Sequence, residues 1–245
     1  MASLVSARAG GTYQPLLVTN VEIAVYARAA TVELADQLAP QSEDAAVAAI
    51  VRLQGVFSTF DSGSELVRWR SGQLAEASSE LVEVLTAAHR WWALSEGTFH
   101  PLMGVLRTRW LRAEAEGQLP QQDELDALVR ELATLPFEAT QTGVRRTGDC
   151  TGLDLNAIAK GYIVDRAVDA ARLPGVTEVL VNAGGDLRHW GGGTLRVGIE
   201  NPAAPGGAPL DVLELGDGAV ATSGPIHRGF QVGTCRTGVS FSECN

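Results

Sequence analysis

The sequence contains few cysteines, no excess of basic residues and no long apolar run. Its three cysteines, Cys150, Cys235 and Cys244, form no CxxC pair, so we expect reduced thiols and no zinc site. The formal net charge of −10 argues against non-specific binding to nucleic acid or anionic lipid, because both need a basic surface. No apolar stretch is long enough to span a bilayer, and the N-terminus lacks a basic segment followed by an apolar run. These absences predict a cytoplasmic protein without a membrane segment or a nucleic-acid partner.

The composition that remains is that of a protein with a substantial core. A length of 245 residues with 45% hydrophobic residues suits one large domain or two intertwined subdomains. Pro40 is expected to end one element, with a helix following it up to Phe57. A second helix is expected to begin at Ser78 or Ser79. Alternating or apolar runs predict strands at 21–25 and 195–199, and a hairpin of 210–215 with 219–222.

The stretch from Gly152 to Asp186, GLDLNAIAKGYIVDRAVDAARLPGVTEVLVNAGGD, predicts a helix, a turn and a buried strand in one unit. Small and apolar residues recur at helical spacing on one face: Ala157, Gly161, Val164, Val168 and Ala171. Pro174-Gly175 should end the helix, since proline cannot continue the hydrogen-bond ladder. The run 179–181 then predicts a strand covered on both faces.

Small and charged residues crowd the start of that helix: Asp154, Asn156, Ala157, Ala159, Lys160 and Gly161. Free N–H groups and the positive end of the helix dipole favour an anion there, and Lys160 adds a full charge. The alternative is a capped helix with a solvated lysine. These six residues alone do not separate the two interpretations.

DLNAIAKGYIVD followed by LVNAGGD resembles the signature of the FAD:protein FMN transferases, the ApbE family. Three further blocks agree in order and spacing: FSTFDSGSEL at 57–66, EGTFHPLMGVLRTRW at 96–110 and GAVATSG at 218–224. The resemblance covers about residues 45 to 224. It implies one ApbE-like domain over 1–245 with an α+β fold, in which mixed or antiparallel sheets of two subdomains are packed by helices.

The resemblance also implies an activity, the transfer of FMN from FAD to a threonine or serine hydroxyl of an acceptor protein, with Mg²⁺ and release of AMP. In such phosphoryl transfer, positioning and charge neutralisation carry most of the catalysis. The family pattern implies that FAD contacts Phe60, Asp154, Lys160 and the segment His100-Pro101-Leu102. The backbone carbonyl of Ala157 is implied as a Mg²⁺ ligand, because magnesium takes oxygen ligands. No catalytic residue is assigned.

Two of these residues have other interpretations. Without the resemblance, Phe60 would be taken as a core aromatic residue. His100 titrates near neutral pH and could be catalytic, but the sequence shows no partner for it. The residues His100, Pro101 and Leu102 also replace a more polar segment of many relatives.

The segment after GAVATSG departs from the family pattern. Thr234 and Cys235 stand where the resemblance implies Asp and Pro, His227 lies too early for the family's histidine, and the magnesium-binding Asp and Thr are absent. We therefore expect a truncated or frame-shifted C-terminus, with FAD binding and little transfer. The alternatives are an FAD-binding protein or FAD pyrophosphatase with a degenerate metal site, and a folding-defective fragment. A Rossmann domain is the weakest rival, because NAGGDLRHWGGG has no GxGxxG between a strand and a helix.

Overall fold

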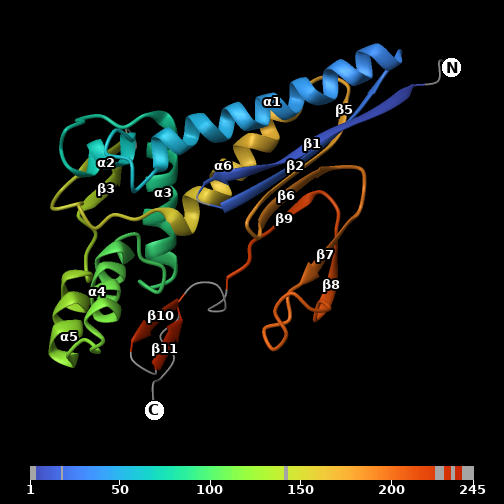
Figure 1. Ribbon diagram of the computed structural model, residues 1–245. Coiled ribbons are helices and arrows are strands. Elements are labelled where there is room, and N and C mark those ends of the chain that lie inside the picture. Colours follow the sequence, from blue (N-terminus) through green and yellow to red (C-terminus); the bar gives the residue numbers. More distant parts are fainter. Residues whose placement is uncertain (1–3, 18, 141–142, 224–228, 233–234, 239–245) are drawn as a thin grey trace. The chain divides into compact units, whose positions relative to one another are not determined.

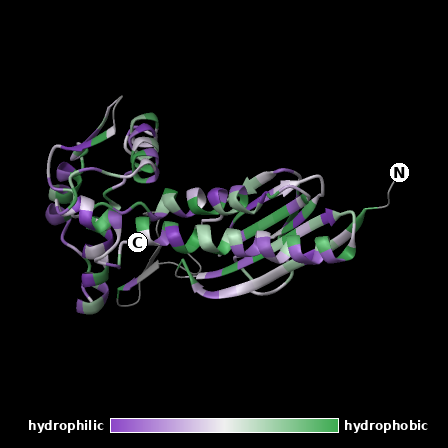
Figure 2. Cartoon of the chain, turned by 90° about the horizontal axis from the view of Figure 1, so that it is seen from above, coloured by the Kyte–Doolittle hydropathy of each residue, from purple (hydrophilic) through white to green (hydrophobic). Residues whose placement is uncertain are grey.

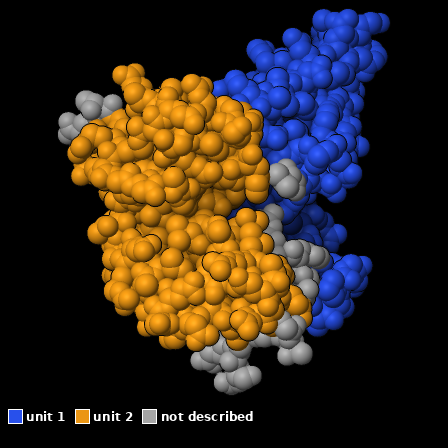
Figure 3. Space-filling view, turned by 60° about the vertical axis from the view of Figure 1, so that its left-hand side comes forward, with its two compact units in different colours: residues 1–54, 160–222 blue, residues 55–159, 223–245 orange. Residues whose placement is uncertain are grey.

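The computed structural model describes the whole chain except residues 1–3, 18, 141–142, 224–228, 233–234 and 239–245. The chain divides into two compact units, each built from two segments (Figure 3). Unit 1 comprises Met1–Gln54 and Lys160–Thr222, and unit 2 comprises Gly55–Ala159 and Ser223–Asn245. The family-like motifs are therefore shared between the units, and each unit is described by itself below.

Unit 1 is built on a five-stranded antiparallel sheet in the order β1-β2-β5-β6-β9 (Figure 1). Its strands are β1 Val5–Leu16, β2 Thr19–Ala29, β5 Val176–Ala183, β6 Asp186–Gly191 and β9 Gly218–Val220. Helices α1 (Val32–Phe57) and α6 (Asn156–Ala171) lie against this sheet, and their first or last turns belong to unit 2. Figure 2 shows hydrophobic and hydrophilic residues alternating along both helices, as expected for helices with one buried side.

The predicted strand at 21–25 is confirmed as part of β2, and the predicted strand at 179–181 as part of β5. The expectation that the second is covered on both faces was wrong. Val179 and Val181 are fully buried, but Leu180 between them is only half-buried. Because successive side chains of a strand point to opposite faces, this alternation places one face of β5 in the core and leaves the other partly open.

Pro40 does not end an element, as we had expected, but lies inside α1. Its ring is exposed, so the carbonyl left without an N–H donor one turn earlier can be satisfied by water. Alanines before and after it, Ala35, Ala39 and Ala46, are fully buried and keep the helix close to its neighbours. Tertiary packing of this side therefore outweighs the local helix-breaking preference of proline.

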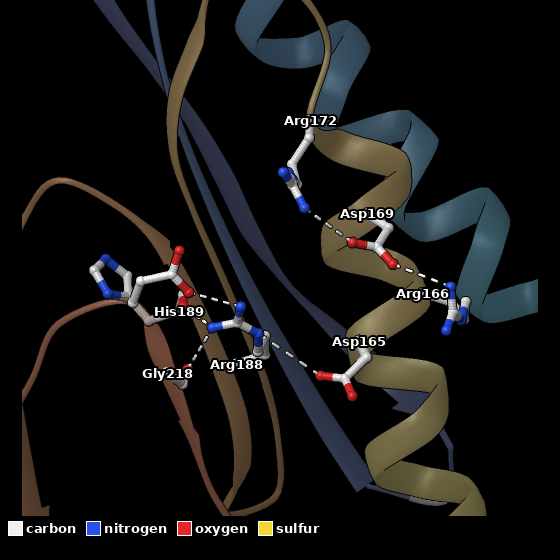
Figure 4. Close-up of polar contacts among 8 residues, drawn as sticks. Asp165, Arg166, Asp169, Arg172, Arg188, His189 and Gly218 are labelled. Atoms are coloured by element: carbon white, nitrogen blue, oxygen red, sulfur yellow. Dashed lines mark hydrogen bonds and ion pairs between the residues drawn. The ribbon is translucent and has the colours of Figure 1, made fainter.

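The hairpin predicted from 210–215 and 219–222 was also wrong. Strand β8 (Asp211–Leu215) pairs with β7 (Leu195–Ile199) instead, whereas β9 joins β6 in the main sheet. Two adjacent residues of β6 hold the intervening turn: His189 Nδ1 lies 2.7 Å from the carbonyl oxygen of Gly216, and Arg188 Nη1 donates to that of Gly218 at 2.9 Å. Figure 4 shows Arg188 also facing Asp165 of α6. These non-local contacts draw β9 away from β8.

Unit 2 consists mainly of helices around a small aromatic core. Its other elements are α2 Glu65–Arg70, α3 Ser79–Leu94, α4 Met103–Glu116, α5 Gln122–Glu131, β3 Phe137–Thr140, β4 Gly143–Arg146, β10 Gly229–Val232 and β11 Cys235–Gly238. Ser78 caps α3 as predicted, with its Oγ accepting from the N–H of Leu81. Trp69 and Phe137 meet edge to face in the core at 6.3 Å between ring centroids. Among the described residues of both units, no helix is long and apolar enough to cross a membrane.

Candidate functional site

The start of α6 is tightly organised and exposes small residues. Asp154 Oδ1 accepts the N–H of Asn156 at 2.9 Å, which satisfies one of the free donors of the first turn. Ala157 and Gly161 are exposed, and a Cβ added to Gly161 would meet nothing within 4 Å. The predicted apolar face is therefore confirmed only from Val164 onward, since Val164 and Val168 are each 2% exposed. At its beginning the same face is open to a ligand.

Lys160 follows this open surface and is held by a carboxylate. Its Nζ lies 2.7 Å from Asp186 Oδ2, with side chains that are 15% and 19% exposed, respectively. The second oxygen of Asp186 accepts the backbone N–H of Thr222 at 3.3 Å. The predicted alternative of a solvated lysine is wrong, because this lysine is half-buried and paired. Asp186 thus joins three family-like blocks: the helix start, the NAGGD segment and the GAVATSG segment.

A tight turn fixes the position of Asp186. Gly184 and Gly185, between β5 and β6, have φ values of +61° and +94°, the left-handed conformation that a two-residue hairpin turn requires. The Oδ1 atom of Asn182 accepts the N–H of Gly185 at 3.0 Å. A Cβ on Gly184 would come within 2.2 Å of Thr19 Oγ1, so only glycine fits there. The two glycines of the motif therefore set the direction in which Asp186 begins β6.

In unit 2, the segment His100-Pro101-Leu102 is buried and linked to Asp154. The N–H of Asp154 donates to the carbonyl oxygen of Pro101 at 2.8 Å. The backbone at Gly104 also lies close to the backbone at Gly152. A Cβ added to Gly104 would lie only 2.7 Å from the carbonyl oxygen of Gly152. Two blocks that are separated by about fifty residues in the sequence are thus in direct contact, and both contain residues that the resemblance assigns to FAD.

His100 uses both ring nitrogens within the fold. Its Nδ1 accepts the N–H of Leu102 at 3.1 Å, so the proton is on Nε2, which donates to the carbonyl oxygen of Leu132 at 2.8 Å. The ring is 8% exposed and meets Trp92 edge to face. Burial lowers the pKa of His100 more than its bond to Leu132 raises it, which favours the neutral form. This histidine positions backbone and has no free nitrogen with which to act as a base.

Two open cavities flank that segment. One, of about 390 Å³, is lined by Leu102, Leu132 and Asp149 among others, and the second, of about 520 Å³, by Trp92, His100 and Leu132 among others. Leu132, the residue bonded to His100, lines both. Leu132 and one residue of the segment therefore contribute to the lining of each cavity.

Phe60 lies in a hydrogen-bonded loop with its side chain exposed. Ser58 Oγ accepts the N–H of Phe60 at 3.3 Å and that of Asp61 at 3.1 Å. The Phe60 side chain is 68% exposed, so its interpretation as a core aromatic was wrong. Spacing alone does not indicate this exposure, because an aromatic residue next to the buried end of a helix has the pattern of a core residue.

Arg70 connects the Phe60 loop to the approach of α6. Its Nη1 donates to the carbonyl oxygen of Leu153 at 2.8 Å, and its Nη2 donates to that of Thr59 at 3.3 Å. Each acceptor is the neighbour in sequence of a residue assigned to FAD, Asp154 or Phe60. Sequence reasoning missed Arg70, since nothing in its spacing indicates a partner 83 residues away. Unit 2 therefore brings together three of the motif segments through backbone carbonyls.

The described residues show no cluster of metal-binding side chains. They contain no group of three or more His, Cys, Asp or Glu side chains that could hold a metal ion. Ala157 is the second residue of α6, where helix geometry directs its carbonyl toward the N–H of Gly161. The carboxylate of Asp186 is paired with Lys160, and burial raises the pKa of the Cys150 thiol to about 11, so that thiol stays protonated. His227 and Thr234, named in the tail, lie outside the described residues.

The chain has an α+β fold with antiparallel sheets, and several of its motif segments meet near the start of a helix. Comparison with known proteins identifies the family that has these features. The sequence model of the ApbE family matches residues 17–242, a wider range than the resemblance had covered, and the chain belongs to this family. The predicted α+β fold is confirmed by the solved flavin transferase ApbE from Vibrio cholerae, with a TM-score of 0.68 at 19% identity over 94% of this chain and 75% of that one. The apo flavinyl transferase ApbE of Pseudomonas stutzeri gives 0.63 at 20% identity, over 96% and 72% of the two chains.

Curated relatives carry the name FAD:protein FMN transferase. The protein from Vibrio cholerae is 31% identical over 197 residues, which is 76% of this chain and 57% of the relative. The protein from Rhodobacter capsulatus is 30% identical over 179 residues, 71% of this chain and 33% of the relative. This chain thus spans somewhat more than half the length of the first of these relatives and a third of the second.

Proposed function

We propose that this chain transfers FMN from FAD to a threonine or serine hydroxyl of an acceptor protein and releases AMP. The observation that carries the proposal is the joining of family motifs by direct contacts: Arg70 and the Asp154 N–H in unit 2, and Asp186 in unit 1. Family membership and the names of the relatives support it. Phe60, Asp154, Lys160 and the backbone of the 100–102 segment are the proposed FAD contacts.

In the proposed reaction, the acceptor hydroxyl oxygen attacks the FMN phosphorus, the P–O bond to the AMP phosphate breaks, AMP leaves, and the hydroxyl proton passes to solvent. The oxygens of the diphosphate carry the charge, and Lys160 would offset it as a point cation. The small exposed residues at the start of α6 allow the diphosphate to approach the backbone, at the positive end of the helix dipole. His100 takes no proton in this scheme, since both of its nitrogens are engaged.

Mg²⁺ is proposed as the ion of this reaction on the family resemblance alone, since no group of three or more His, Cys, Asp or Glu side chains gathers among the described residues. The alternative expected from the sequence, an FAD pyrophosphatase or FAD-binding protein in which FAD is bound without transfer to a protein, is not favoured by the family match or by the names of the relatives. Water would then be the acceptor, and free FMN and AMP the products. The cytoplasmic location predicted from the sequence stays a prediction.

The test incubates the chain with FAD, Mg²⁺ and an acceptor protein that carries a flavinylation site. Covalent flavin on the acceptor is measured by in-gel fluorescence and intact mass, and free FMN and AMP by chromatography. We expect labelled acceptor with the wild-type chain and little label with Lys160→Ala. Asp165→Asn is the control, because it removes a charge from the same helix at a residue that faces Arg188 instead. Release of free FMN without labelled acceptor would favour the pyrophosphatase, and the absence of both would overturn the proposal.

A further inference from the structure

The pairing of Lys160 with Asp186 indicates a role for Asp186, a residue to which the family resemblance assigned none. Lys160 is the only lysine in the sequence, and the other residues of the Lys+Arg count are arginines. An ammonium is a compact point charge on a flexible stem, so its direction depends on what holds it. Here it is held by one carboxylate oxygen at 2.7 Å.

Asp186 is itself fixed from several directions. Its backbone follows directly on the two-glycine turn, and it pairs with Ala183 across the hairpin. Its second oxygen accepts from the N–H of Thr222, and a Cβ on Gly185 would lie 3.4 Å from the Cβ of Thr222. The carboxylate is therefore a rigid anchor, while the lysine is the flexible partner.

We infer that Asp186 is a positioning residue for Lys160, which holds the ammonium and directs it toward the incoming diphosphate. The inference rests on the proposed function in one respect: the proposed function identifies the bound anion as the diphosphate of FAD. Before FAD binds, the carboxylate keeps the lysine from folding away along the helix. When the diphosphate arrives, the ammonium uses another of its three donors for a phosphate oxygen, while Asp186, still bonded to Thr222, continues to direct it.

This arrangement makes binding and transfer respond differently to the loss of the carboxylate. Asp186→Asn removes a negative charge that competes with the phosphate, so FAD should bind with unchanged affinity or about two- to fivefold tighter. The lysine loses its orientation, however, so the single-turnover rate of flavin transfer should fall by about tenfold or more. In a Lys160→Ala background, Asp186→Asn should have little further effect on that rate. A merely structural aspartate would lower binding and transfer together.

The first measurement needs no flavin. When the purification tag contains no lysine, the only amines of the protein are Lys160 and the N-terminus. Limited acetylation modifies both, and mass spectrometry gives the acetylation rate of each. The N-terminal amine serves as the internal reference. We expect Asp186→Asn to increase the rate at Lys160 relative to the reference by about threefold or more, as the amine is released. Asp165→Asn, a loss of the same charge from α6, should leave the ratio unchanged. Equal ratios in wild type and Asp186→Asn would overturn the inference.

The second measurement follows FAD binding by flavin fluorescence and transfer by single-turnover labelling of the acceptor. Unchanged or tighter binding with slower transfer in Asp186→Asn supports the inference. Parallel weakening of both, or no change in either, overturns it. If the wild-type chain fails to bind FAD, the proposed function fails, while the acetylation ratio still decides whether Asp186 positions Lys160.

Discussion

His100 and Lys160 both belong to family-like blocks and can both carry positive charge, yet the structure uses them in opposite ways. His100, in unit 2, is buried and gives each ring nitrogen to a backbone group. Lys160, in unit 1, is held by one side chain beside an open surface. Residue type alone therefore does not determine whether a polar side chain can bind a ligand. What matters is whether the side chain keeps a donor or acceptor for that ligand.

The largest expected effect is on stability and separates the two residues. His100→Ala leaves the Leu102 N–H and the Leu132 carbonyl without partners and opens a cavity, so it should lower the free energy of unfolding by about 2–4 kcal/mol. Lys160→Ala should cost about 1 kcal/mol, because Asp186 keeps its bond to Thr222. Urea denaturation with a common m-value would measure both. A larger loss of unfolding free energy for Lys160→Ala than for His100→Ala would show that Lys160, and not His100, is the structural residue of the two.

The second prediction concerns the backbone approach that links the His100 segment to Asp154. Gly104→Ala should cost about 1–3 kcal/mol and weaken FAD binding, since the added Cβ would meet the Gly152 carbonyl oxygen at 2.7 Å and displace the approach to Asp154. Gly55→Ala is a matched control in α1, where the added Cβ meets nothing within 4 Å. That change should stabilise by about 0.5–1 kcal/mol and leave binding unchanged. Thermal melts and FAD titration of both variants would test the contrast.

The sequence predicted well those features that depend on local pattern. The helix that contains Lys160 and the strand after it follow from apolar spacing and from glycines where the backbone needs them. The cap at Ser78 follows from side-chain chemistry within three residues. The resemblance then supplied the α+β fold, which the solved relatives confirm.

Non-local contacts could not be predicted in this way. Arg70 reaches Leu153 across 83 positions, and Asp186 reaches Thr222 across 36. The pairing of β9 with β6 likewise depends on Arg188 and His189 holding a distant turn. Pro40 is tolerated within α1 because its ring faces solvent, which no local rule reveals. The proposed roles of Phe60, Asp154, Lys160 and Ala157 stay predictions until they are measured.

The third prediction uses pH to sharpen the difference between the two residues. Burial lowers the pKa of His100 in the folded state, so the unfolded chain takes up a proton at higher pH than the folded chain does. Its contribution to stability is therefore complete above the unfolded pKa of about 6.5 and is lost as pH falls below it. One group contributes a slope of at most about 1.4 kcal/mol per pH unit.

Denaturation curves from pH 8 to pH 5 would show this loss for the wild type and a shallower dependence for His100→Gln. Comparison at pH 8, where the histidine is neutral in both states, isolates the cost of the substitution itself. An equally steep pH dependence in the variant would show that His100 is not the group responsible.

The smallest expected effect on stability is at Phe60, and it tests whether an exposed residue of a motif belongs to a binding surface. The side chain is 68% exposed, so Phe60→Ala should change the free energy of unfolding by less than about 0.5 kcal/mol. If the ring contacts flavin, as the resemblance implies, FAD affinity should nevertheless fall severalfold, because base–aromatic stacking contributes about 1–3 kcal/mol in comparable complexes. Trp91→Ala, at another aromatic residue that is 54% exposed, is the control and should alter neither quantity much. Weaker FAD binding in Phe60→Ala but not in Trp91→Ala would show that the exposed Phe60 ring contacts the ligand. Phe60 would then resemble Lys160, which is available to a ligand, and differ from His100, which is not. Equal FAD affinity in both variants and the wild type would remove Phe60 from the site.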